Sequence, residues 1–220
     1  MNFAIDVVSD FVCPWCFLGK SRVKKAMALA QEKHPELRFQ LNWLPYFLGP
    51  DVPQAGQPYR AYLEAKFGGA RQVESAQQRV IDAGSEDGVE YDFARIATYP
   101  NTLRAHRLVY RAQSTGHPQA EIDALVDRLF VAHLQRGEDI GSIAVLADIA
   151  AECGDRKDAV AAYLESEDGE MKVKSLVDKV GKLGTNGVPH FILQRRMAVS
   201  GAQSATVLAA AIMQAMQLPG

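Results

Sequence analysis

Strand-type sequence occurs only near the two ends of this 220-residue chain. Residues 3–8 form an apolar run that predicts a buried strand, and residues 38–44 alternate apolar and polar side chains with the period of two that a strand requires. Two more strands are predicted at 190–193 and 197–200, joined by a short turn at 194–196. If one sheet uses strands from both ends, the long segment between them must be an insertion.

That middle segment has helical periodicity. After a proline-rich loop at 45–58, the spacing of apolar residues predicts a series of helices. They cover residues 59–67, 69–83, 101–115, 119–136, 143–152, 156–165 and 170–183. A block of this length must pack as a subdomain because it is too long for a loop. We therefore expect an α/β fold in which 1–58 and 185–220 form one domain and 59–184 form a wholly helical insertion.

The tetrapeptide Cys13-Pro14-Trp15-Cys16 lies where the first predicted strand meets a helix predicted over 17–31. Pro14 suits the first position of that helix, where the N–H that proline lacks is not needed. Cys13 then caps the helix, and the unpaired N–H groups and the positive end of the helix dipole favour its thiolate. Cys16 falls on the face that should pack on the sheet. The sequence thus predicts an exposed attacking thiol at Cys13 and a sheltered resolving thiol at Cys16.

The Cys-x-x-Cys pair has two other interpretations. A Cys-x-x-Cys pair can be half of a zinc site, but the only other cysteine is Cys153, and no two histidines are spaced three to five residues apart. Cysteines can also be small buried apolar residues without a chemical role. Redox chemistry is favoured over both because the pair stands at a predicted helix start. No metal is expected.

Charge and cysteine content narrow the class of protein further. The net charge of -2 provides no electrostatic footprint for nucleic acid or an anionic membrane. The first residues lack a basic start and include Asp6, so they predict a strand and no signal peptide. Three cysteines do not make a secreted disulfide framework. We expect a cytoplasmic protein that interacts with neither nucleic acid nor membrane.

Several motifs together resemble one protein family. They are SDFVCPWC at 9–16, LGPDVP at 48–53, YLEAKFG at 62–68, PNTLRAH at 100–106 and GVP at 187–189. With these motifs in this order, the chain resembles the DsbA-like branch of the thioredoxin superfamily over essentially its whole length. It is most similar to FrnE-type members, which are related to 2-hydroxychromene-2-carboxylate isomerases and kappa-class glutathione transferases.

The resemblance implies a thioredoxin fold with a large all-helical insertion. It also implies that Pro189 is a cis proline lying against the sulfurs of Cys13 and Cys16, and that these three residues are catalytic. The alternative for Pro189 is an ordinary trans proline that opens an edge strand. In the family, the residue before the cis proline pairs with a substrate strand through its backbone. The expected substrate contacts are therefore Pro14, Trp15 and Val188.

The sequence departs from the family at two positions. Thioredoxin and DsbA place a buried acid where this chain has Val7. Asp6 should lie on the opposite strand face, so Asp10 is the better candidate for handling protons. An equally weighted alternative is that Asp10 accepts loop or helix N–H groups near Cys13. Trp15 replaces the histidine of DsbA, so Cys13 should be less acidic, with a potential between roughly -120 and -270 mV.

The favoured function is thiol–disulfide exchange on protein or small-molecule disulfides. One alternative is a glutathione-dependent isomerase or transferase of small aromatic compounds, whose final helix, predicted to start at Ser200 or Gly201 with Gln203 at capping-box spacing, would receive a glutathione carboxylate. Another is a non-catalytic peptide-binding chaperone. His106 is a candidate substrate contact, although a structural role in packing is favoured. No resident cofactor is expected; glutathione is a candidate co-substrate, and a homodimer is an open option.

Overall fold

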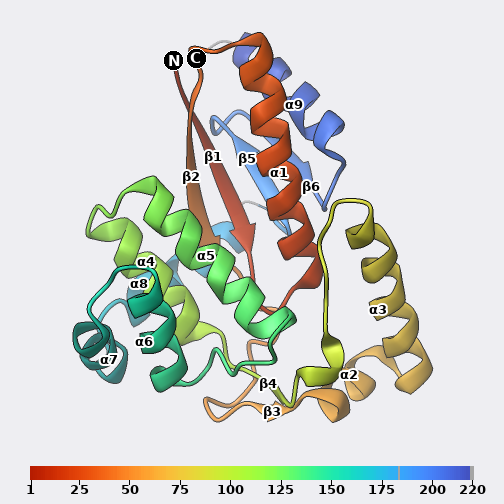
Figure 1. The fold of residues 1–220 in the computed structure, drawn as a ribbon, viewed down its shortest axis with the longest axis vertical. Coiled ribbons are helices and arrows are strands. Elements are labelled where there is room, and N and C mark those ends of the chain that lie inside the picture. Colours follow the sequence, from red (N-terminus) through yellow and green to blue (C-terminus); the bar gives the residue numbers. More distant parts are fainter. Residues whose placement is uncertain (183, 219–220) are drawn as a thin grey trace. The chain divides into compact units, whose positions relative to one another are not determined.

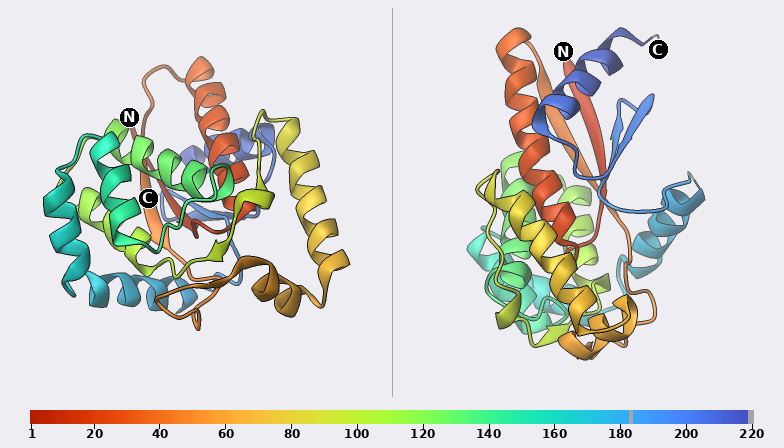
Figure 2. Two further views of the ribbon diagram at one scale, coloured as in Figure 1. Left: turned by 60° about the horizontal axis from the view of Figure 1, so that its bottom comes forward. Right: turned by 90° about the vertical axis from the view of Figure 1, so that its right-hand side faces the viewer.

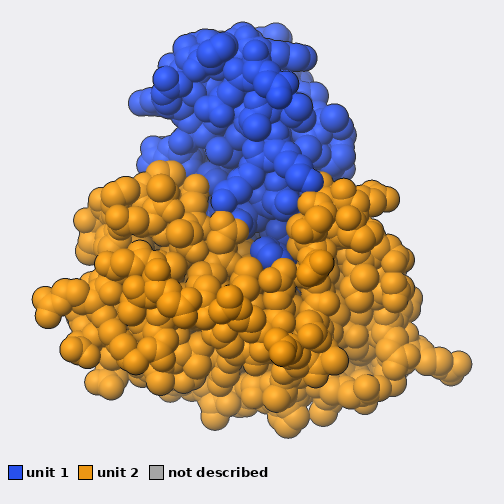
Figure 3. Space-filling view, viewed as in Figure 1, with its two compact units in different colours: residues 1–46, 176–220 blue, residues 47–175 orange. Residues whose placement is uncertain are grey.

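The computed structural model describes residues 1–182 and 184–218. The chain separates into two compact units, 1–46 with 176–220, and 47–175 (Figure 3). Segments from both ends of the sequence therefore build the first unit, and one continuous segment builds the second.

A four-stranded sheet forms the centre of the first unit (Figure 1). Its strands are β1 (Asn2–Ser9), β2 (Arg38–Pro45), β5 (His190–Leu193) and β6 (Met197–Ser200), in the order β2-β1-β5-β6. β1 runs parallel to β2 and antiparallel to β5, which pairs antiparallel with β6. The strands predicted at the two ends of the chain thus belong to one sheet.

Helices α1 (Pro14–Lys33) and α9 (Ala205–Gln217) pack against each other on one side of this sheet (Figure 2). The core between them and the sheet includes Phe3, Ile5 and Val7, alternate residues of β1 that are almost fully buried. Phe191 of β5 lies opposite Val7 and is buried with them. The alternation explains the sequence pattern, because successive side chains of a strand point to opposite faces.

The final helix starts later than its sequence predicts. Its N-terminal cap is Ser204, whose hydroxyl accepts a hydrogen bond from the N–H of Val207 at 3.3 Å. Ser200, predicted to be the cap, is the last residue of β6. Gly201 turns the chain there with a φ of +79°. Gln203 donates from its side chain to the Ser200 carbonyl at 3.0 Å instead of completing a capping box.

The helices of the second unit agree in number and order with those that the sequence predicts. They are α2 (Tyr59–Phe67), α3 (Ala70–Ser85), α4 (Leu103–Ser114), α5 (Gln119–Leu134), α6 (Ile143–Glu152), α7 (Lys157–Glu165) and the first half of α8 (Glu170–Lys182). Leu183, the predicted last residue of α8, lies outside the described residues. The second half of α8 belongs to the first unit.

The second unit is not wholly helical. It contains a short 3-10 helix, η1 (Phe93–Arg95), and two short strands, β3 (Gln57–Pro58) and β4 (Thr98–Tyr99), which pair antiparallel. Strands of two residues are too short to show an alternating pattern, so the sequence does not reveal them. The insertion is otherwise helical, and the α/β class predicted for the chain is correct.

The proline-rich loop belongs to the second unit, although the sequence suggests an insertion starting at 59. Lys66 donates to the carbonyl of Leu48 at 2.6 Å, and the Asn101 side chain donates to the carbonyl of Val52 at 2.7 Å. A side chain at Gly49 would meet the Tyr62 hydroxyl at 2.8 Å. The 48–53 motif of the family resemblance therefore contacts both of the other middle motifs, and these contacts attach the loop to the helices.

Arg107 of α4 holds the end of α7 in place. Its guanidinium is buried and donates to four backbone carbonyls between 2.7 and 3.2 Å. These carbonyls belong to Tyr163, Leu164, Ser166 and Asp168. The last carbonyls of a helix lack intrahelical partners, and Arg107 supplies donors to those of Tyr163 and Leu164 at the end of α7.

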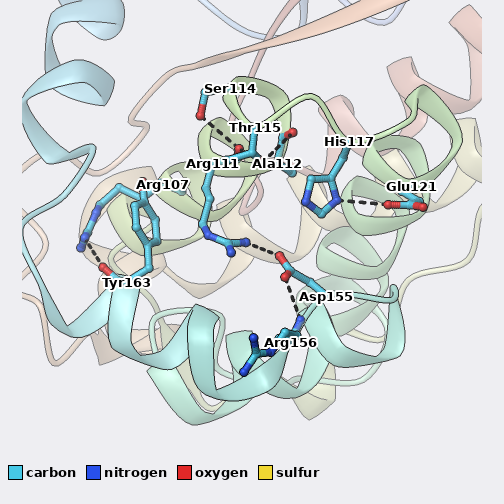
Figure 4. A network of polar contacts seen from close by, with 10 residues as sticks. All are labelled: Arg107, Arg111, Ala112, Ser114, Thr115, His117, Glu121, Asp155, Arg156 and Tyr163. Atoms are coloured by element: carbon cyan, nitrogen blue, oxygen red, sulfur yellow. Dashed lines mark hydrogen bonds and ion pairs between the residues drawn. The ribbon is translucent and has the colours of Figure 1, made fainter.

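Figure 4 shows the same region from close by. The Arg107 guanidinium lies over the Tyr163 ring, 5.1 Å from its centroid. One turn further along α4, Arg111 forms an ion pair with Asp155, which lies just before α7. Side chains of α4 thus fix both ends of α7.

Candidate active site

Cys13 and Cys16 lie at the start of α1, as the sequence predicts. Cys13 is the N-terminal cap with extended backbone (φ −88°, ψ 111°), and Pro14 is the first helical residue. The Cys13 N–H donates to the Asp10 carbonyl at 3.1 Å, and the Cys16 N–H donates to the Cys13 carbonyl at 3.1 Å. Among the described residues, no N–H group of the first turn donates to the Cys13 sulfur. Any support of a thiolate by the helix start is therefore electrostatic.

The loop before β5 reaches the same place from the far end of the chain. The Val188–Pro189 peptide bond is cis. The Cys13 thiol donates to the Val188 carbonyl oxygen with a sulfur–oxygen distance of 3.9 Å. Pro189 itself lies against α1, because a Cβ atom on Gly19 would be only 2.8 Å from the Pro189 Cγ. Cys13 and Gly19, near the start of the chain, thus lie next to Val188 and Pro189, near its end.

The pKa of the Cys16 thiol lies well above its ordinary value of 9.0. Burial is the largest cause, because it disfavours the charged thiolate, and contact with Cys13 raises the pKa further. The Ser9 hydroxyl and the backbone of Asp10 act in the opposite direction but do not outweigh these causes. Cys16 therefore holds its proton at neutral pH.

Cys13 is not exposed, in contrast to the expectation from sequence. Only 4% of its surface is accessible, compared with 1% for Cys16. The Val188 carbonyl lies against the Cys13 thiol, a contact that helix periodicity alone does not reveal. The exposed residue of the tetrapeptide is Trp15, at 38%. Both motif cysteines are free thiols in this structure.

The two aspartates near the motif have different surroundings. Asp10 is fully buried, and its backbone contacts both Cys13 and Cys16. Asp6 lies on the other face of β1, where its carboxylate accepts a hydrogen bond from the Asn42 side chain at 2.7 Å. Of the two, Asp10 is adjacent to the thiols. Its role in proton transfer stays a prediction.

His106 lies in the second unit, on α4. Its buried ring packs edge-on against Phe47, with centroids 5.6 Å apart. The packing role favoured from sequence fits this position, and a contact with substrate stays a prediction. A different histidine, His190, follows the cis proline, and its ring lies 2.8 Å from the Ser200 hydroxyl. Burial lowers the pKa of His190 below 6.5, so this ring is neutral at pH 7.

The sequence does not identify two residues that shape the site. Gly19 has no side chain, so Pro189 can pack directly against α1. The glycine lies one turn after Cys16, but the sequence does not show that Pro189 is its partner. Ser9, the last residue of β1, is buried and favours the Cys16 thiolate. Both act through the geometry of the site.

Residues 1–182 and 184–218 contain no group of three or more His, Cys, Asp or Glu side chains arranged to hold a metal ion. None of the helices in that range has the length and apolar character needed to span a bilayer.

The fold and the dithiol at its helix start define a thioredoxin-like protein with a helical insertion. Residues 4–213 match the family described as DSBA-like thioredoxin domain, so the chain belongs to this family. Members of the family are thiol–disulfide oxidoreductases.

Individual relatives agree with this assignment. The probable DsbA oxidoreductase SCO1869 of Streptomyces coelicolor is 26% identical, with 99% of this chain and 92% of that chain covered and a TM-score of 0.87. The uncharacterized protein YwbO of Bacillus subtilis is 26% identical over 160 residues, covering 70% of this chain and 68% of that protein. The cytosolic disulfide reductase DsbM of Pseudomonas aeruginosa, solved with GSH, shares the fold at 19% identity and a TM-score of 0.65, covering 98% of this chain and 100% of its own.

Proposed function

We propose that the protein exchanges thiols and disulfides through Cys13 and Cys16, with Cys13 attacking and Cys16 resolving. The observation that carries this proposal is the 3.9 Å contact between the Cys13 sulfur and the Val188 carbonyl, beside the cis Pro189. It brings the thiol at the start of α1 together with the backbone of the loop before β5, to which we propose that a substrate strand binds. The raised pKa of Cys16 also suits a resolving thiol, because Cys16 stays protonated while the other thiol attacks.

The reaction runs in two exchanges. The Cys13 thiolate attacks one sulfur of a substrate disulfide, so that a Cys13–substrate bond forms while the substrate S–S bond breaks and the leaving sulfur takes up a proton. Cys16 then loses its proton and attacks the Cys13 sulfur, which releases the second substrate thiol. The substrate gains two electrons and two protons, and the protein becomes a Cys13–Cys16 disulfide. The reverse sequence oxidises a substrate dithiol.

Several neighbouring groups have proposed roles in these steps. Loss of the Cys13 proton removes the hydrogen bond to Val188, and the freed carbonyl accepts an N–H group of the substrate strand. The exposed ring of Trp15 and the adjacent Pro14 contact the substrate beside the attacking sulfur. Asp10, a fully buried acidic residue three positions before Cys13, takes the proton that Cys16 must release.

We propose disulfides of proteins or small thiols as substrates, with glutathione as electron donor. The support for glutathione is that DsbM, which has the same fold, was solved with GSH. In the reducing cytoplasm expected from the sequence, the protein would act as a reductase or isomerase. His106 as a substrate contact and a homodimeric state belong to the same proposal.

Reduction of insulin disulfides with glutathione as donor tests the proposal. The Cys13→Ser variant should lose exchange activity, and Cys16→Ser should accumulate a mixed disulfide because the resolving thiol is missing. Cys153→Ser is the matched control, since Cys153 lies in the second unit at the end of α6, and it should keep full activity. Full activity of the Cys13→Ser protein would refute the proposal.

The glutathione-dependent isomerase is less well supported. The N–H of Val207 in the first turn of α9, the helix expected to receive a glutathione carboxylate, already donates to the Ser204 hydroxyl. Turnover of a chromene carboxylate by the Cys13→Ser protein would favour the isomerase. The chaperone alternative requires suppression of aggregation that persists after both motif cysteines are replaced.

A further inference from the structure

We propose that a cleft on the opposite face of the sheet from α1 and α9 binds a small organic anion that carries an apolar group. The cleft has a volume of about 750 Å³ and lies between β1, β2, the β5–β6 turn and the second half of α8. All of its lining residues belong to the first unit. Because side chains alternate along β1, Ala4 and Asp6 face this cleft while Phe3 and Ile5 face the core. The proposed site is thus on a different side of the sheet from α1 and its dithiol.

The size and walls of the cleft suit a small molecule. Ligand sites in proteins usually measure about 300–1,000 Å³ and combine apolar side chains with polar groups that fix the orientation of the ligand. The lining of this cleft combines four apolar residues with six polar or charged ones. Here Ala4 and Leu44 form apolar parts of the sheet side, and Leu176 and Val180 form the helix side. An aromatic ring or short aliphatic chain has apolar contacts on both walls.

Two cations give the cleft its preference for an anion. Lys179 comes from α8 and Arg195 from the β5–β6 turn, so the charges approach the cleft from separate elements. Neither side chain has a hydrogen bond or ion pair with another residue of the described chain. The acidic side chain in the lining is Asp6, and it is already bonded to Asn42. The net charge of the lining is therefore positive, and both cations are available to a carboxylate or phosphate.

The backbone of the β5–β6 turn is unusual at the residue that supplies one cation. Gln194 and Arg195 have left-handed φ values of 52° and 57°. A hairpin turn with two left-handed residues normally uses Asn-Gly, because longer side chains are disfavoured there. Such conformations persist where the surroundings enforce them, and they concentrate at binding sites.

Hydrogen bonds hold this turn against its neighbours. The Gln194 N–H donates to the Ala4 carbonyl at 3.0 Å, and its side chain donates to the Asn2 carbonyl at 3.1 Å. Arg196, the next residue, donates to the Leu218 carbonyl at 2.9 Å. The turn is thus fixed to β1 on one side and to the end of α9 on the other, which keeps Arg195 at the edge of the cleft.

A second hollow continues from the first along β5 and β6. It measures about 440 Å³ and shares Asp6, Leu44 and Arg195 with the cleft. Ile192 and Ala198 extend its apolar floor. Arg195 therefore stands between two hollows, so it can bind the anionic group of a ligand whose apolar part extends into either one.

Nuclear magnetic resonance titration with 2-naphthoate tests the proposal, with 2-naphthylmethanol as the uncharged analogue. Naphthoate should shift the amide resonances of Ala4, Asn42 and Gln194 saturably, and the alcohol should bind much more weakly. The variants Arg195→Gln and Lys179→Gln should each weaken naphthoate binding about fivefold, the effect of one partly screened ion pair. Phosphate alone, as a second probe, shows whether the charged group suffices without the apolar part.

Control variants separate a specific site from general electrostatics. Lys33→Gln changes the net charge equally but lies at the end of α1, on the other side of the sheet, and should leave binding unchanged. Arg195→Gly removes the cation from a backbone that suits glycine, so it should weaken binding without loss of thermal stability. Equal binding of naphthoate and the alcohol, or equal weakening by Lys33→Gln, would overturn the proposal. The Cys13→Ser protein should bind as the wild type does, independently of any exchange activity.

Discussion

At the scale of single residues, the two motif cysteines differ in what surrounds their sulfur atoms. The Cys13 sulfur contacts the Val188 carbonyl, whereas the Cys16 sulfur is enclosed by Ser9, Asp10 and Cys13. Burial of Cys16 disfavours its charged thiolate, whatever polar groups lie nearby. A thiol of this kind reacts only when a disulfide sulfur is brought to it, which fits the resolving role proposed for it.

Replacing Cys13 and Cys153 together (Cys13→Ser, Cys153→Ser) leaves Cys16 as the only thiol, so it can be titrated alone. Its thiolate should appear only above pH 9.0, because burial is the main cause of its raised pKa and remains in this variant. The Cys16 thiol ionises at a lower pH in the unfolded chain than in the folded protein. The neutral buried thiol therefore contributes stability at low pH, and this contribution is lost as pH rises through the folded pKa. Thiolate absorbance and denaturation midpoints against pH measure both effects. A Cys16 thiolate at pH 7 would contradict the expected burial.

Gly19 should matter because it leaves room for the cis-proline loop. In Gly19→Ala the new Cβ would lie 2.8 Å from the Pro189 Cγ and 3.2 Å from the Phe191 ring. Alanine favours a helix by about 1 kcal/mol over glycine, but overpacking of about 1–3 kcal/mol should outweigh this gain. We expect lower stability in urea denaturation, slower disulfide exchange and a shifted reduction potential.

Gly181→Ala is the matched control for that substitution. Gly181 is also helical, in α8, and no atom of residues 1–182 or 184–218 outside its own helix backbone and chain neighbours lies within 4 Å of its added Cβ. This variant should be slightly more stable than the wild type, with unchanged exchange rates. If both alanine variants behave alike, the contact with Pro189 does not control the site.

At the scale of elements, contacts between helices decide what the sequence leaves open. α7 spans only Lys157–Glu165, and an isolated helix of that length is not stable in water. Its last carbonyls find a partner in Arg107, and Arg111 reaches Asp155 before its start. Two arginines on one face of α4 therefore determine where α7 lies.

Arg107→Met should destabilise the second unit strongly. The substitution removes the four hydrogen bonds of a buried guanidinium, including the fully buried one to the Leu164 carbonyl, which we expect to reduce the free energy of unfolding by about 2–5 kcal/mol. Urea denaturation followed by circular dichroism measures the change. Arg60→Met is the control, because Arg60 is exposed and pairs only with surface glutamates, and it should change stability little. A similar loss in both variants would mean that the carbonyl contacts contribute little.

At the scale of the whole molecule, the sequence predicts the elements better than their partners. Apolar spacing identifies β1, α1, β2 and the helices of the second unit, because each pattern repeats over several turns or strand positions. Apolar spacing does not identify β3 and β4, because a strand of two residues is too short to show an alternating pattern. The sequence also misplaces the start of α9, because both Ser200 and Ser204 are suitable N-terminal caps. The second unit includes the loop after β2 because of hydrogen bonds to residues far along the chain.

The sequence by itself determined the α/β class, the helical insertion, and the placement of Cys13 and Cys16 at a helix start, because these depend on local periodicity and on residues next to one another. Only the tertiary structure decided the burial of Cys13, the approach of Pro189 to Gly19, and the cleft with Lys179 and Arg195. Each of these depends on side chains that the chain brings together from distant positions. Such contacts result from packing of the complete fold, and no local pattern encodes them.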